Sequence, residues 1–177
     1  MKRAVIFVFL FSLFINFPAF ALTEGEDVMP VTERYTGVVT HVYDADEIEI
    51  NGAHLILLGV AAPDRGLSGK PKDCYSEDST KFLEEIVLNQ EISYSYDPLY
   101  GRHGKRGIPS VYVYIADRLI NGEMIENGYA FADLSKKYVE KEKFLKLEAD
   151  AKFNGFHIWH TCPVECFPEK SCRVRNW

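Results

Sequence analysis

Residues 37–64 read GVVTHVYDADEIEINGAHLILLGVAAPD, and this stretch contains three short strand patterns separated by turns. Residues 38–43 are rich in β-branched and aromatic side chains, and residues 47–50 alternate strictly between acidic and apolar, which is the period of a half-buried strand. Asn51-Gly52 follows, and the pair predicts a hairpin because both residues tolerate the positive φ of a type I′ turn. Residues 54–59 supply the return strand.

Two carboxylates lie at the corners of this stretch. Asp46 stands beside the end of one strand, and Asp64 follows a proline after the last one. If the sheet curls, the two side chains can meet, so the stretch predicts an acidic site at one end of a curled sheet.

The later elements have the order helix, two strands, then helices. A helical pattern begins at Ser76, whose neighbours offer capping and acidic side chains, and strand patterns cover residues 92–96 and 111–115. Further helical patterns cover residues 121–127 and 138–152. Three strands, a helix and two more strands is the OB-fold arrangement. We therefore predict an α+β fold, mainly β: an OB-fold with a five-stranded barrel and about three helices.

The first 21 residues have the organisation of a secretory signal peptide. Two basic residues precede an uncharged run, and Ala19-Phe20-Ala21 is a small-x-small cleavage pattern. The run is short for a membrane span of roughly 20 apolar residues, which favours cleavage after Ala21 over an anchor. We expect residues 22–34 to be a flexible lead-in, 35–160 the barrel domain and 161–177 a cysteine-containing tail. The mature protein is then secreted or periplasmic, without stable membrane association, and is expected to be a monomer.

The net charge of the chain is acidic. Cleavage after Ala21 would remove two of the 20 basic residues and no acidic one, which leaves a net charge of −8. Nucleic-acid-binding proteins usually carry a basic face, because phosphate neutralisation supplies most of their affinity. An acidic total weakens the case for such a partner but does not exclude a local basic groove.

Four cysteines lie beyond the predicted signal peptide. An even number in an exported protein favours two disulfides, although three pairings are open for four cysteines. The alternative is a metal cluster, but the C-x3-C and C-x5-C spacings fit no strong zinc pattern. We expect the pairs Cys74–Cys162 and Cys166–Cys172.

Several segments resemble, in order, the motifs of the staphylococcal nuclease (thermonuclease) family. Residues 42–46 (VYDAD) resemble its V-x-D-G-D-T motif, and residues 57–64 (LLGVAAPD) resemble R-L-x-G-I-D-A-P-E. The Y-G-R loop is matched within residues 100–107, the N-x-x-L-V-x-x-G-L-A helix at 121–130 and the closing E-x-x-A helix with its G-x-W at 148–159. The resemblance covers about residues 37–159 and also implies the OB-fold.

The resemblance implies calcium-dependent hydrolysis of DNA and RNA phosphodiesters. In that family two acids hold the ion, a glutamate activates water and two arginines stabilise the charge growing on the phosphate. Asp46 stands at the first calcium-ligand position and Asp44 at a supporting aspartate, while a turn aspartate is the alternative reading of each. Asp64 stands at the glutamate position, as the catalytic group and a remaining metal ligand.

Three departures fall at the positions that matter most. Ala61 replaces the second calcium-binding aspartate, Ile56 replaces the first phosphate-binding arginine, and Asp64 is one methylene shorter than glutamate. Calcium affinity follows the number and charge of oxygen ligands, so calcium binding should be weak. Losing one preorganised charge at a transition state commonly costs about 2.7–4 kcal/mol, so hydrolysis should be severely weakened.

A dense basic patch occupies the loop after residue 97. Its charged and stacking side chains are expected to contact the phosphates of single-stranded DNA or RNA, although a solvated loop is the alternative. The spacing favours Arg106 as the second family arginine and leaves Arg102 open, and Arg65 could substitute for the missing first one. The expected phosphate-binding residues are Tyr100, Arg102, Lys105, Arg106 and Arg65.

Two functions remain open at this point. The first is a secreted thermonuclease-like hydrolase with a weakened or rearranged calcium site. The second is a catalytically inactive nuclease-fold module that binds nucleic acid or a protein partner. Convergence of Asp46, Asp64 and a basic side chain on one cavity would support the first, and apolar closure of that cavity by Ala61 and Ile56 would support the second.

Overall fold

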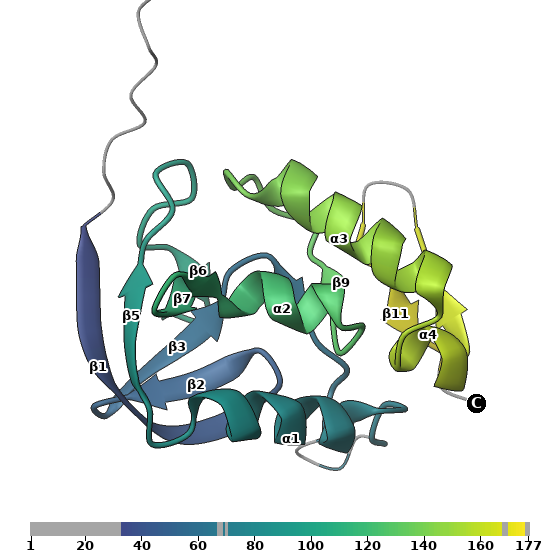
Figure 1. Ribbon diagram of the computed structural model, residues 1–177, viewed down its shortest axis with the longest axis horizontal. Coiled ribbons are helices and arrows are strands. Elements are labelled where there is room, and N and C mark those ends of the chain that lie inside the picture. Colours follow the sequence, from purple (N-terminus) through teal and green to yellow (C-terminus); the bar gives the residue numbers. More distant parts are fainter. Residues whose placement is uncertain (1–32, 67–68, 70, 168–169, 176–177) are drawn as a thin grey trace, which may run out of the picture.

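The computed structural model describes residues 33–66, 69, 71–167 and 170–175 (Figure 1). The predicted signal peptide, its cleavage after Ala21 and nearly all of the expected lead-in lie outside the described residues. Among the helices of the described part of the chain, none is long and apolar enough to cross a membrane.

Five strands form the barrel. They pair in the order β3-β2-β1-β5-β7, and parallel pairing of β3 with β7 closes the ring. Each of the other neighbouring pairs is antiparallel. The strands are β1 (Arg34–Asp44), β2 (Glu47–Ile50), β3 (Ala53–Leu57), β5 (Glu91–Ser95) and β7 (Ile108–Ile115). The predicted five-stranded OB-fold barrel is confirmed.

The hairpin between β2 and β3 has the predicted turn. Asn51 and Gly52 have φ values of 49° and 83°, as a type I′ turn requires. The Asn51 side-chain oxygen also accepts a hydrogen bond from the Val38 N–H at 3.1 Å, which ties the turn to β1. This register places Ile48 and Ile50 in the core and leaves Glu47 and Glu49 half-buried on the other face.

Six two-residue strands complete the β-structure of the described residues. β6 and β8 extend the barrel sheet from β7, β4 pairs with β9, and β10 pairs with β11 in the tail. They are β4 (Val60–Ala61), β6 (Gly104–Lys105), β8 (Arg118–Leu119), β9 (Phe131–Ala132), β10 (Val164–Glu165) and β11 (Arg173–Val174).

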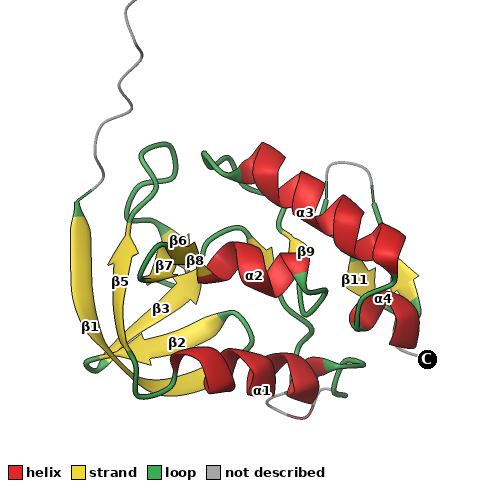
Figure 2. Cartoon of the chain, viewed as in Figure 1, coloured by secondary structure: helices red, strands yellow, loops and turns green. Residues whose placement is uncertain are grey.

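Four helices lie in the described residues, against about three expected, because a single turn follows the third one. They are α1 (Ser76–Val87), α2 (Ile120–Glu126), α3 (Lys141–Asn154) and α4 (Ile158–Thr161). Figure 2 shows α2 across the barrel, with α3 leading to α4 and the tail. α1 begins at Ser76 as predicted, but no side chain caps it. Gly155 ends α3 in the left-handed conformation, with φ of 64°.

The core fills the barrel and the space beneath α2 and α3. Val39, Ile48, Leu57, Val111 and Met124 are completely buried there. A second, smaller apolar cluster is built around Phe131 and Ile158 beneath the tail. The tail therefore has apolar packing of its own against the domain.

Asn121 is the buried polar group that joins β3, β7 and α2. Its side-chain nitrogen donates to the carbonyls of Leu58 (2.9 Å) and Val111 (3.0 Å), and its side-chain oxygen accepts from the Val113 N–H at 2.8 Å. These bonds satisfy backbone groups where the barrel closes. An asparagine at this position thus fixes α2 over the closing strands.

Two disulfides join the described cysteines in the predicted pairs. Cys74–Cys162 connects the loop before α1 to the end of α4, and Cys166–Cys172 closes a small loop in the tail. No free cysteine remains among the described residues.

Candidate functional site: an acidic and cationic cavity at the barrel end

A cavity of about 450 Å³ lies where β2, β3 and β4 meet the β5–β7 connection. Asp46 and Lys105 both line it, together with the ring of Tyr100. The full lining set is Asp46, Glu47, Ile56, Val60, Ala61, Ala62, Tyr100, Lys105, Asp133, Ser135, Lys136 and Ser171. The structure therefore brings together one predicted metal ligand, one predicted phosphate-binding cation and the predicted stacking ring.

Asp46 has an unusual protonation equilibrium. Burial raises its pKa to about 7, and the neighbouring carboxylates of Asp44 and Glu47 act in the same direction. Lys105 and a hydrogen bond from the Ala62 N–H lower it, but they do not outweigh burial. A cation bound in this cavity would stabilise the charged carboxylate, so the site favours a positive partner.

Asp44, two residues before Asp46, forms hydrogen bonds that stabilise this end of the barrel. Its Oδ1 accepts from the Ala45 N–H at 2.8 Å and the Thr80 hydroxyl at 3.3 Å, and its Oδ2 accepts from the Arg65 N–H at 3.5 Å. Asp44 thus connects the end of β1 to α1 and to the loop after Asp64. The supporting role that the resemblance implies for Asp44 in metal binding stays a prediction.

A buried ion pair forms the opposite wall of the cavity. Asp133 is 8% exposed, and its Oδ2 lies 2.9 Å from the Lys136 ammonium. Its Oδ1 accepts from the Ser135 N–H at 3.0 Å and from the Ser171 hydroxyl at 3.3 Å. Burial acts to raise the pKa of Asp133, but hydrogen bonds from Ser135 and Lys136 outweigh it and hold the pKa below its usual value.

Sequence reasoning did not single out Asp133 or Lys136. The one local signal is the D-L-S-K spacing, which is typical of an aspartate that bonds to the backbone two residues on. That signal predicts a turn and says nothing about which cavity the turn faces.

Asp64 does not line this cavity. It is exposed, and its Oδ1 accepts from the Gly66 N–H at 2.8 Å. Its own N–H donates to the Asp73 carboxylate at 2.9 Å. Asp64 therefore organises the loop that follows the barrel strand, and the predicted meeting with Asp46 at one cavity is not seen.

The three candidate arginines also lie away from the lining of the cavity. The Arg65 guanidinium donates to the Tyr43 carbonyl at 3.1 Å. Arg102 lies over the Tyr96 ring at 4.7 Å and donates to the Tyr35 hydroxyl. Arg106 is exposed in the turn between β6 and β7, with φ of 55°. Of the predicted cations, Lys105 is the one that reaches the cavity.

The chain also matches known proteins in sequence. A family model described as staphylococcal nuclease homologue matches residues 54–161. The chain belongs to the staphylococcal nuclease homologue family. It is also similar to the curated "Probable endonuclease LCL3" of Komagataella phaffii, with 30% identity over 112 residues. That match covers 60% of this chain and 48% of the relative, so the chain spans about half the relative's length.

The cavity wall of this staphylococcal nuclease homologue is apolar at two positions. Ile56 pairs with Glu47 across β2 and β3 and is 4% exposed, and Ala61 is half-buried. Both line the cavity without closing it. Neither side chain can bind a metal ion or a phosphate. Among the described residues, no group of three or more histidine, cysteine or acidic side chains is placed to hold a metal ion.

Proposed function

We propose that the protein is a weak nuclease that hydrolyses phosphodiesters of single-stranded DNA or RNA at the cavity of Asp46 and Lys105. The observation that carries the proposal is the presence of both side chains and the Tyr100 ring in one cavity of a nuclease-family barrel. The similarity to a probable endonuclease of Komagataella phaffii supports the same class of reaction.

Each side chain would have a distinct part in binding the substrate. The Lys105 ammonium offers a point charge to a phosphate oxygen, and Tyr100 offers a face on which a base can stack. Asp46 would hold a cation beside that phosphate. Lys105 also helps to keep Asp46 charged, because the ammonium opposes the effect of burial on the pKa of that carboxyl.

The donor set fits a resident calcium ion poorly. Calcium takes six to eight oxygen ligands, and multiple carboxylates are the rule at tight sites. Here Glu47 lies 3.2 Å from the His54 ring and Asp133 is paired with Lys136, which leaves Asp46 as the principal carboxylate. We therefore propose weak calcium dependence, in which the ion would supply charge stabilisation only while substrate phosphate is also present.

Binding without hydrolysis is the second candidate function. Its specific support is the pair of departures in the wall, since Ile56 and Ala61 remove one arginine and one acid, and Asp64 lies outside the cavity. A barrel of this kind could hold a single strand through Lys105 and Tyr100 without cutting it.

We further propose that the protein is exported and acts as a monomer. The two disulfides are compatible with an oxidising compartment, where such bonds persist. The intact mass of the exported form tests the leader, because cleavage after Ala21 predicts a chain that begins at Leu22.

A cleavage assay separates the two candidate functions. Purified exported protein is incubated with labelled single-stranded DNA and RNA, with calcium and with a chelator. The nuclease proposal predicts slow, calcium-stimulated cleavage that Asp46→Asn and Lys105→Gln both abolish. Asp117→Asn and Lys146→Gln, at exposed residues outside the cavity, serve as matched controls. Binding without cleavage under every condition would replace the nuclease proposal with the binding one.

A further inference from the structure

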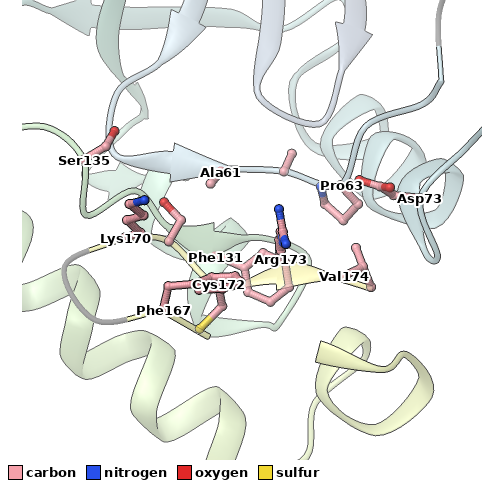
Figure 3. A pocket seen from close by; sticks show the side chains of 12 residues that line it. Ala61, Pro63, Asp73, Phe131, Ser135, Phe167, Lys170, Cys172, Arg173 and Val174 are labelled. Carbon is pink, nitrogen blue, oxygen red and sulfur yellow. The ribbon is translucent and has the colours of Figure 1, made fainter. Parts of the chain in front are cut away.

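A second cavity, of about 570 Å³, adjoins the first (Figure 3). Figure 3 shows β4 with Ala61 along one side and the tail with Phe167 and Cys172 along the other. Four residues line both cavities: Ala61, Ala62, Ser135 and Ser171. A chain bound at Asp46 and Lys105 therefore has a direct way into the second cavity.

Covalent and polar bonds hold the tail wall in place. The Cys166–Cys172 disulfide closes the segment that carries Phe167, and Cys172 itself lines the cavity. The Ser171 hydroxyl donates to Asp133, which belongs to the first cavity. The disulfide and this hydrogen bond thus tie Cys172 and Ser171 to the tail and to the first cavity.

The lining combines aromatic faces with cations. Phe131 is 1% exposed and packs edge-on against Trp159 with centroids 5.2 Å apart, so it forms a rigid floor. Phe167 is half-buried, and the Arg173 guanidinium lies over its ring, 4.7 Å from the centre. The same guanidinium also pairs with the Glu165 carboxylate at 3.4 Å. Lys170 adds a second cation at the exposed edge. Aromatic faces beside basic side chains are what single-stranded nucleic acid binds.

An acceptor completes the lining. Asp73 faces this cavity, and its carboxylate also accepts the Asp64 N–H. Exocyclic amino groups of nucleobases donate hydrogen bonds, and a carboxylate accepts them. The cavity therefore offers partners to a base as well as to its phosphate.

We infer that the disulfide-closed tail forms a second nucleotide subsite, which takes the base and phosphate next to the nucleotide bound at Asp46 and Lys105. The inference rests on the proposed function, since it extends the same nucleic-acid path. Phe167 stacks on the base, and Lys170 and Arg173 meet the adjoining phosphate. The subsite makes affinity depend on the length of the bound strand.

The test compares two lengths of one ligand on the complete exported protein. Fluorescein-labelled deoxycytidine 5′-monophosphate, which is too short to span both subsites, and a labelled deoxycytidylate hexamer with phosphorothioate linkages, which keep the charge and resist hydrolysis, are each titrated with protein in the presence of calcium and followed by anisotropy. Since one base–aromatic stack is worth about 1–3 kcal/mol, Phe167→Ala should weaken hexamer binding by about 5- to 160-fold and leave mononucleotide binding within about twofold. Phe153→Ala removes a phenylalanine that is 90% exposed and outside the cavity, and should change neither.

Two further variants keep the result interpretable. Phe167→Trp retains the stacking face and should restore hexamer binding, which a mere folding role for Phe167 does not predict. Cys166→Ser with Cys172→Ser opens the tail loop and should reproduce the length-specific loss. Thermal melts verify that each variant is folded.

The outcomes separate the subsite from the proposed function. If Phe167→Ala binds both lengths like wild type, the subsite is refuted while the proposed function stands. If Lys105→Gln leaves mononucleotide binding unchanged and Phe167→Ala still weakens hexamer binding, the proposed cleavage site fails and the tail subsite stands. Failure of wild type to bind either length overturns both.

Discussion

The scaffold around Asp97 and Asn121 differs from the cavity around Asp46 in how its buried polar atoms are bonded. Asp97 is 1% exposed, and its carboxylate accepts four hydrogen bonds, from the Leu99 and Tyr100 N–H groups, the Tyr112 hydroxyl and the Val139 N–H. Asp46 instead has neighbouring carboxylates and a raised pKa. The hydrogen bonds of Asp97 and Asn121 stabilise the fold, whereas a bound cation would supply the partner that stabilises the charged Asp46 carboxylate.

Breaking the scaffold at Asp97 should have the largest effect. Asp97→Ala would leave the Leu99, Tyr100 and Val139 N–H groups and the buried Tyr112 hydroxyl without their acceptor, so we expect the free energy of unfolding to fall by about 4 kcal/mol. Chemical denaturation measures the loss, with exposed Asp117→Ala as control. A loss below about 1 kcal/mol would mean that the loop carrying Tyr100 and Lys105 is held by other contacts.

Asn121→Ala removes the uncharged member of the pair of buried polar side chains, Asp97 and Asn121, that stabilise the fold. The variant would leave the Leu58 carbonyl and the Val113 N–H without their hydrogen-bond partner where the barrel closes. We expect the free energy of unfolding to fall by about 3 kcal/mol. Asn154→Ala removes an exposed asparagine that bonds to the Asp150 carbonyl and should cost far less. Equal melting temperatures for the two variants would contradict the role given to Asn121.

Charged side chains at the two apolar positions of the cavity wall should increase cleavage. Ala61→Asp with Ile56→Arg adds an acid and a cation to the cavity wall, and cleavage of single-stranded DNA should rise at least about a hundredfold, the equivalent of about 2.7 kcal/mol. Calcium titration of the rate is the measurement. Because Ile56 is buried, Ala61→Asp alone serves as a second variant in case the arginine prevents folding.

Asp46→Asn should give the smallest change in free energy, and its sign should depend on pH. The folded pKa of about 7 lies above the ordinary value of 3.8, so the wild type loses stability as pH rises between these values. At about 1.4 kcal/mol per pKa unit the shift is equivalent to about 4 kcal/mol, and solvent screening at this half-buried side chain reduces it. In chelator at pH 8 the asparagine variant should therefore be more stable by about 2 kcal/mol, and at pH 4 the difference should nearly vanish. Chemical denaturation at both pH values measures the difference. A variant less stable than wild type at pH 8 would refute the claim that the charged Asp46 carboxylate destabilises the folded protein.

Local pattern was sufficient for much of the fold. The alternation of residues 47–50, the Asn51-Gly52 turn and the start of α1 at Ser76 depend on neighbours in sequence, and each appears in the structure. β1 begins at Arg34, earlier than its β-branched residues indicated, because it pairs with β5 along residues 34–38. That pairing joins segments far apart in sequence, which no local pattern encodes.

The candidate site was less predictable because it depends on where loops end in space. Spacing favoured Arg106, but a turn with two positive φ values places that residue on the surface and gives the cavity its neighbour Lys105. Asp64 lies directly after the barrel strand, but Gly66 and Asp73 hold it in a separate loop. The tail cavity joins residues 61–63 to Phe167 and residues 170–174, a pairing that only the folded chain reveals.

The Cys74–Cys162 disulfide joins cysteines 88 residues apart in sequence and so closes a covalent ring that contains the barrel strands β5 and β7 and the helices α1 to α4. The exposed loop with Leu99, which is 70% exposed, lies within that ring and is a natural point of proteolytic attack. A single cut there opens the ring but releases no fragment, because both pieces stay joined through sulfur. A nicked molecule should therefore migrate as one band without reductant and as two bands with it.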